Sequence, residues 1–90
     1  MIQPYRVELT TAAERQLRKL DKPIQKRPAI ALAKLAADPR PAGVKALTGV
    51  PAALRIRVGD YRIVYLVQDQ QLIVLVLGLG HRRQVYRDFS

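Results

Sequence analysis

The sequence has no cysteine, one histidine and one serine, and these shortages exclude several kinds of site. Without cysteine, neither a disulfide nor a thiolate site can form. A single imidazole and seven scattered carboxylates make a metal site unexpected. The only serine is Ser90, which leaves no Ser-His-Asp triad. A glycine-rich phosphate loop is also missing, so we expect no nucleotide hydrolysis and no cofactor.

Long hydrophobic runs are missing too. The most apolar stretch, LIVLVL at residues 72–77, is far shorter than the roughly 18 residues of a membrane-spanning helix. The opening MIQPYRVELT lacks the apolar core and cleavage site of a signal peptide. We therefore predict a cytoplasmic protein without a membrane segment. A length of 90 residues, 49% of them hydrophobic, suits a single domain over 1–90.

Negative charge is scarce. Sixteen Lys and Arg residues against seven Asp and Glu residues give a net charge of +9. This excess predicts attraction to nucleic acid or to an acidic protein partner, and a merely soluble basic surface is the alternative. After Lys45 every cation is an arginine. Because a guanidinium can hold phosphate with two hydrogen bonds, the second half of the chain favours phosphate binding.

Hydrophobic periodicity predicts one strand, two helices and three further strands. The first helix is expected to begin at a capping box of Thr11 and Glu14. The second would be kinked by Pro28 and end at residues 38–39, before a loop over 40–53. The expected strands are 5–9, 54–58, 61–67 and 72–79. This order predicts an α+β fold in two layers, with a strand, a two-helix hairpin and a three-stranded antiparallel meander.

Arginines gather on one face of the predicted hairpin. If residues 59–60 form its loop, Arg57 lies opposite Arg62, and Arg55 shares their face. Like charges directly opposite destabilise a sheet, so an anion is expected between them. The same alternation along the last strand places His81 towards this face, together with Ile73, Leu75, Leu77 and Leu79.

The groups that remain suit cleavage of RNA without a metal. The substrate's own 2′-hydroxyl is then the nucleophile, and the protein orients it, moves protons and stabilises charge on the phosphorane. Simpler interpretations remain for each residue. The arginines also fit solvated edge positions or partners of nearby carboxylates, and His81 also fits a structural role.

The run LRIRVGDYRIVYLVQDQQLIVLVLGLGHRRQVYR resembles the C-terminal half of RelE-type toxins in the RelE/ParE superfamily. The resemblance extends back through DPRPAGVKALTG to YRVELT. RelE-like members bind ribosomal RNA and cleave messenger RNA in the ribosomal A site. An antitoxin wraps and neutralises them. The resemblance therefore implies a toxin of a type II pair that forms a complex, such as a heterotetramer, with its cognate antitoxin. A ParE-like inhibitor of DNA gyrase and an inactive basic binding domain are the alternatives.

The resemblance also implies roles for individual residues. It assigns catalysis to Arg62, Arg82, Tyr86 and His81, and substrate binding to Lys45, Arg55, Arg57 and Arg83. The functional arginine after the glycine is either Arg82 or Arg83, because this tail is shorter than in some members. Arg55 and Arg57 stand where well-studied members have lysine. Since arginine keeps its proton in proteins, these two are expected to stabilise charge and not to transfer protons.

Proton transfer is assigned to Tyr86 first and His81 second. Neighbouring guanidinium groups favour a phenolate and disfavour an imidazolium, so either side chain could accept the proton of the 2′-hydroxyl. The family pattern places the tyrosine more consistently than the histidine, which decides the order.

Overall fold

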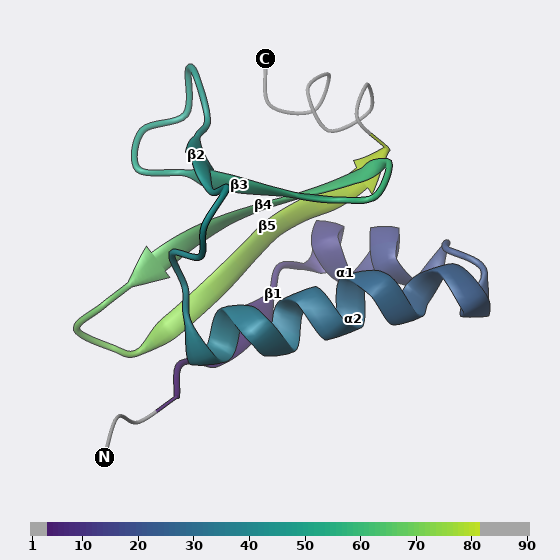
Figure 1. The fold of residues 1–90 in the computed structure, drawn as a ribbon, viewed down its shortest axis with the longest axis horizontal. Coiled ribbons are helices and arrows are strands. Elements are labelled where there is room, and N and C mark those ends of the chain that lie inside the picture. Colours follow the sequence, from purple (N-terminus) through teal and green to yellow (C-terminus); the bar gives the residue numbers. More distant parts are fainter. Residues whose placement is uncertain (1–3, 82–90) are drawn as a thin grey trace.

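Two helices pack on one face of a five-stranded sheet in the computed structural model, which describes residues 4–81 (Figure 1). The order in the sheet is β1-β5-β4-β3-β2, with β1 parallel to β5 and all other neighbours antiparallel. The elements in chain order are β1 (Arg6–Leu9), α1 (Thr11–Arg18), α2 (Lys22–Ala37), β2 (Lys45–Ala46), β3 (Leu54–Val58), β4 (Tyr61–Gln68) and β5 (Ile73–His81).

The predicted α+β class is confirmed, and the sheet has one strand more than predicted. The additional strand, β2, lies inside the predicted 40–53 loop and pairs with the start of β3. Two residues are too few to show a periodicity, so the pattern could not reveal it. No helix in the described part of the chain is long and apolar enough to cross a membrane.

The helical layer begins one residue earlier than its capping signal suggested. The N-cap of α1 is Thr10 and not Thr11, since the Thr10 Oγ1 accepts a hydrogen bond from the Ala13 N–H at 3.1 Å. Glu14 forms an ion pair with Arg18, one turn along the helix. β1 ends at Leu9, so Thr10 is the extended residue at the junction, where a cap is needed.

Apolar side chains form a cluster on each face of the sheet. On the helical face, Leu35 of α2 packs against fully buried residues of β4 and β5. α2 continues through Pro28, which is itself fully buried. On the opposite face, Leu47 and Ala53 cover Val64 of β4. Leu47 thereby anchors the 40–53 segment to the sheet.

A β-bulge in β5 changes which of its side chains face the helices. The pairing shifts between Val64 and Tyr65, so Tyr65 lies opposite Val76 and Val64 lies opposite Gly78. Leu77 is left as the additional residue. The Thr10 hydroxyl donates to the Leu77 carbonyl at 3.0 Å, which ties the bulge to the start of α1.

Because of the bulge, part of the predicted sheet face is wrong. Leu79 belongs to the cluster beneath the helices and not to the face of Arg62, because the alternation changes phase at Leu77. The Gln16 Oε1 on α1 accepts a hydrogen bond from the Leu79 N–H at 2.8 Å, just beyond the bulge. The helix thus stabilises an irregularity that single-strand periodicity cannot predict.

Candidate nucleic-acid interface

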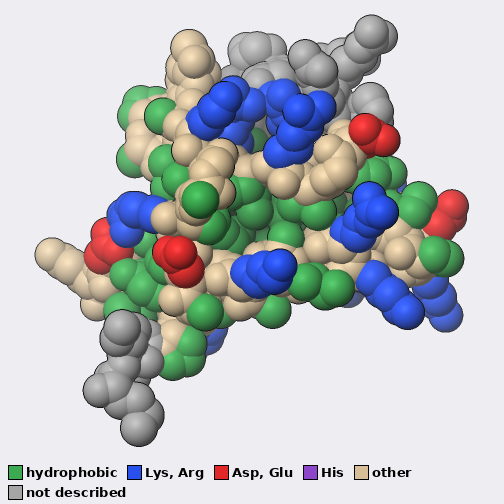
Figure 2. All heavy atoms as spheres, viewed as in Figure 1, with side chains coloured by type: hydrophobic (Ala, Val, Ile, Leu, Met, Phe, Trp, Pro, Cys, Tyr) green, Lys and Arg blue, Asp and Glu red, His purple; other side chains and the backbone are tan. Residues whose placement is uncertain are grey.

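Four cations share the face of the sheet that lies opposite the helices. The register sets Lys45 opposite Arg55 and Arg57 opposite Arg62. Directly opposed residues share a face, and so do alternate residues of one strand. The intervening Ile56 packs towards the helices, so the four cations point away from them. We call Lys45, Arg55, Arg57 and Arg62 the basic face; Figure 2 shows Lys and Arg side chains gathered over this part of the sheet.

Arg62 is the most enclosed member of the basic face. Its side chain lies on β4, between β3 and β5, and the residue is only 8% exposed, whereas Arg57 is exposed at the outer strand. Gly80 is its partner on β5 and contributes no side chain beside the guanidinium. A charged group held this deeply in a sheet has few conformations, as a preorganised anion-binding group requires.

The turn after β3 brings a helical arginine close to these strands. The register confirms the predicted two-residue loop, in which Gly59 adopts φ +61°. A Cβ at residue 59 would lie only 3.0 Å from Nη1 of Arg27, which belongs to α2. Gly59 therefore supplies both the left-handed conformation and the space for this guanidinium.

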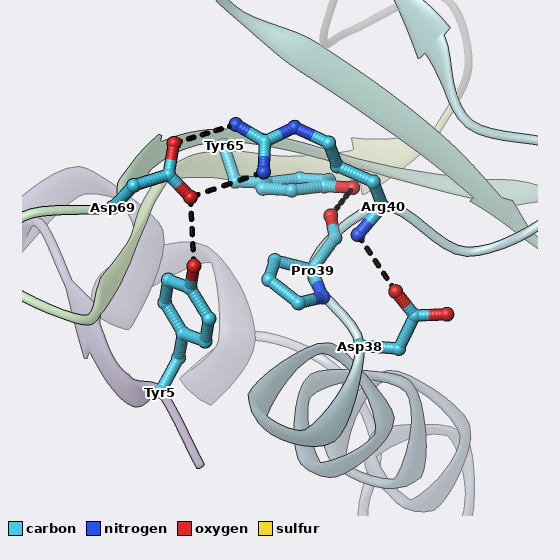
Figure 3. A network of polar contacts seen from close by, with 6 residues as sticks. All are labelled: Tyr5, Asp38, Pro39, Arg40, Tyr65 and Asp69. Carbon is cyan, nitrogen blue, oxygen red and sulfur yellow. Dashed lines mark hydrogen bonds and ion pairs between the residues drawn. The ribbon is translucent and has the colours of Figure 1, made fainter. Parts of the chain in front are cut away.

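A polar network lies at the other end of β4 (Figure 3). The Arg40 guanidinium donates to both oxygens of Asp69 at 3.1 and 2.9 Å, and the Tyr5 hydroxyl donates to the same carboxylate at 2.7 Å. These donors lower the pKa of Asp69 to about 2, with Arg40 as the largest cause. The contacts join the chain before β1, the segment after α2 and the β4–β5 turn. Asp69 therefore pairs with Arg40, at the opposite end of β4 from Arg62.

Tyr65 extends this network into the core. Its ring is fully buried, and its hydroxyl donates to the Pro39 carbonyl at 2.8 Å. Burial raises the pKa of Tyr65 to about 12, so the phenol stays protonated and keeps this bond. We call Tyr5, Pro39, Arg40, Tyr65 and Asp69 the polar clasp. Its hydrogen bonds give both phenols a structural role.

The remaining predicted site residues lie at the C-terminal end. His81 is the last residue of β5, and the register pairs it with Tyr61, while Gly80 lies opposite Arg62. The direction of the His81 side chain lies outside what the structure describes, so its place on the face of Arg62 stays a prediction. Arg82, Arg83 and Tyr86 lie outside the described residues. Residues 4–81 contain no group of three or more His, Asp or Glu side chains that could hold a metal ion.

The sequence analysis did not predict a groove that lies between α2 and the edge of β3. It has a volume of about 500 Å³, and its lining includes Arg27, Ile30 and Lys34 of α2. The signal was present in the sequence. Ile30 lies three residues after one cation and four before the other, so all three share one face of the helix. Arg57 links the groove to the basic face, because it lines the groove as well.

Known proteins resemble this chain along most of its length. Residues 7–86 match the family model described as the ParE toxin of the type II toxin–antitoxin system parDE. The chain belongs to the RelE/ParE toxin superfamily. Toxin RelG of Mycobacterium tuberculosis is 32% identical over 85 residues, which are 93% of this chain and 98% of RelG. A putative RelE-like toxin of Escherichia coli is 34% identical over 82 residues, which are 89% of this chain and 85% of that one.

Solved structures of this superfamily share the fold. The M. tuberculosis RelBE2 toxin–antitoxin complex matches with a TM-score of 0.75 and 32% identity, over 88% of this chain and 99% of the matched chain. A mutant of E. coli toxin RelE in the free state matches with a TM-score of 0.78 and 26% identity, over 96% and 94%. The RelE-like α+β architecture predicted from the sequence is thereby confirmed.

Proposed function

We propose that this RelE/ParE toxin is a ribosome-dependent messenger-RNA endonuclease that acts in the cytoplasm without a metal. The pairing of Arg57 with Arg62 on the basic face carries the proposal. Two guanidinium groups side by side repel each other until an anion lies between them. A phosphodiester matches them, because each guanidinium can donate two parallel hydrogen bonds to phosphate oxygens. The similarity to RelG and to RelE structures supports the same reaction class.

The reaction requires little from the protein beyond placement and charge. The 2′-hydroxyl of the RNA attacks the adjacent phosphorus and gives up its proton, and the 5′-oxygen leaves and takes up a proton. The enclosed guanidinium of Arg62 would stabilise the charge that builds on the phosphorane. Lys45, Arg55 and Arg57 would hold the flanking phosphates in register.

The proposed proton-transfer groups come from the C-terminal end. Tyr86 is the proposed base, with His81 as the second candidate, and the resemblance to the family supports this order. Arg82 would share the stabilisation of the phosphorane, and Arg83 would bind substrate. A phenol suits this surface, because neighbouring cations favour its ionised form.

A cognate antitoxin is the proposed regulatory partner. Relatives from M. tuberculosis and E. coli were solved as toxin–antitoxin complexes. With a net charge of +9, this chain would attract an acidic polypeptide as well as RNA. The partner is expected from the gene adjacent to the one for this chain.

The match to the ParE model favours gyrase inhibition as a second candidate function. A reconstituted translation reaction, read by primer extension, separates the two. We expect the chain to cut messenger RNA at the codon in the ribosomal A site and to leave gyrase supercoiling unchanged. Inhibited supercoiling with intact messenger RNA would establish the ParE-like function instead.

A further inference from the structure

An apolar area continues the side of the sheet that carries the basic face. Leu66 of β4 packs with the apolar cluster opposite the helices, and it lies beside Leu75 of β5. The two neighbours of Leu75 in the chain pack beneath the helices, so Leu75 and Ile73 point away from them. All three residues are partly exposed. We call Leu66, Ile73 and Leu75 the apolar platform; it covers β4 and β5, which run side by side in Figure 1.

Polar side chains of β1 and β4 border the apolar platform. In the register of β1 with β5, Glu8 lies beside Leu75 and Arg6 lies beside Ile73. The residues on either side of Glu8 pack towards the helices, so Glu8 and Arg6 share the face of the platform. Gln68 of β4 lies opposite Ile73. The platform therefore has an apolar floor and a rim of hydrogen-bonding groups.

Glu8 is the only acidic residue in the strands that the structure describes. Its side chain is 41% exposed, and its carboxylate lies 3.7 Å from the guanidinium of Arg6. An exposed ion pair of this kind contributes little to stability. A carboxylate on this side of the sheet also repels phosphate groups. The part of an RNA that it can attract is a base, because bases carry hydrogen-bond donors.

The distance between the basic face and the apolar platform suits a short run of RNA. Leu66 follows Arg62 by four residues on β4, which is about 13 Å in an antiparallel strand. An extended RNA strand covers this distance with a few nucleotides. A phosphate held between Arg57 and Arg62 therefore leaves a nearby base over the platform. A base matches this site, because its flat face is apolar and its edge forms hydrogen bonds.

We propose that the apolar platform seats one base of the RNA substrate and that Glu8 selects bases with an amino group. The choice of RNA as ligand rests on the proposed function. Adenine, cytosine and guanine each present an exocyclic amino group that can donate to a carboxylate oxygen. Uracil presents carbonyl oxygens instead, which the Glu8 carboxylate repels. The chain should therefore disfavour uracil at one position, a few nucleotides from the scissile phosphate.

Binding of RNA that cannot be cut tests the proposal without requiring catalysis. Short single-stranded oligonucleotides with 2′-methoxy groups keep their bases and phosphates but lack the attacking hydroxyl. A series with cytosine or uracil at each position in turn would be titrated with the full chain. At one position we expect the parent to bind cytosine about tenfold more tightly than uracil. Glu8→Gln should bind the two within about twofold, because an amide can also donate to the uracil carbonyl.

Two further variants control this titration. Glu14→Gln makes the same change of charge on an exposed position of α1, on the helical side of the sheet, and should keep the preference of the parent. Leu75→Ala lowers the floor and should weaken binding of the cytosine oligonucleotide by about fivefold. A parent that binds cytosine and uracil equally at every position would overturn the proposal. So would a preference that survives in Glu8→Gln, or one that Glu14→Gln also removes.

Cleavage on programmed ribosomes keeps this inference separate from the proposed function. With messenger RNA randomised around the A-site codon, the parent should leave few cuts near uracil at one position, and Glu8→Gln should lose this bias. A chain that shows the base preference in binding but cuts nothing would contradict the endonuclease function alone. Cleavage with a profile that Glu8→Gln leaves unchanged would overturn the platform and leave the endonuclease to stand. Loss of antitoxin binding in Leu75→Ala, with RNA binding unchanged, would show that the platform binds protein instead.

Discussion

Arg57 and Arg62 show how a single pair of residues can favour function over stability. They lie directly opposite each other on β3 and β4, and one of them is almost buried. A sheet selected only for stability would place an apolar or oppositely charged pair there. The arrangement is understandable if the folded chain works with an anion between the two guanidinium groups.

Removal of one member should therefore stabilise the free chain. For Arg57→Thr we expect the free energy of unfolding to rise by about 0.5 kcal/mol, because the repulsion disappears and threonine suits a strand. Urea denaturation at low salt would measure the change. The advantage of the variant should shrink as salt screens the parent pair. A variant less stable than the parent at low salt would contradict this account.

Tyr65 is a second residue whose environment predicts a measurable effect. Tyr65→Phe removes the hydrogen bond to the buried Pro39 carbonyl, and we expect a loss of about 1–2 kcal/mol in the free energy of unfolding at neutral pH. Folding raises the pKa of Tyr65 from 10.0 to about 12. Its contribution is therefore complete below pH 10 and lost as the pH rises through 12.

Urea denaturation at several alkaline pH values tests this assignment. The parent chain should lose stability above pH 10 more steeply than Tyr65→Phe. Identical alkaline profiles for the two chains would show that the Tyr65 phenol does not control this loss.

At the scale of the elements, features that local sequence determines were predicted correctly, and features that contacts between elements determine were not. Alternation gave the register of β3 with β4, because Gly59 marks the loop and no irregularity interrupts either strand. The phase of β5 was wrong beyond Leu77, where hydrogen bonds from α1 hold the bulge. The glycines at 78 and 80 were the only local sign of it.

Local patterns could not predict the groove itself, although the spacing of Arg27, Ile30 and Lys34 places these three residues on one face of α2. Its walls come from α2 and β3, and their separation depends on where the sheet ends. Local patterns describe each element but not how far apart two elements lie. Among the described residues, Ile30 is the large hydrophobic residue that stays exposed, at 56%, and it marks this uncovered surface.

The polar clasp makes the junction of three elements sensitive to acid. Folding lowers the pKa of Asp69 from 3.8 to about 2. The carboxylate therefore contributes stability above pH 3.8, and this contribution is lost as the pH falls through 2. We expect Asp69→Asn to lower the melting temperature at pH 7, with a difference from the parent that narrows below pH 4.

Asp60→Asn serves as the control for this acid dependence. It removes an exposed carboxylate on the β3–β4 turn, outside the clasp. Thermal unfolding of the three chains at several pH values would compare them. A difference between Asp69→Asn and the parent that stays constant down to pH 2 would contradict the clasp as its origin.

At the scale of the whole molecule, charge and fold divide the surface into regions with different tasks. The helices cover one face of the sheet, the basic face occupies the other, and the groove lies at the outer edge between them. Arg57 belongs to both surfaces, because it lies opposite Arg62 on the basic face and also lines the groove.

The central claim is that the basic face holds the scissile phosphate, and single-turnover cleavage on programmed ribosomes by Arg62→Ala tests it most directly. We predict a cleavage rate lower by about 10²–10³-fold, the usual effect of losing one preorganised donor at a transition state. Ribosome binding, shared by many cations, should change far less. Cleavage by Arg62→Ala at the parent rate would contradict the claim.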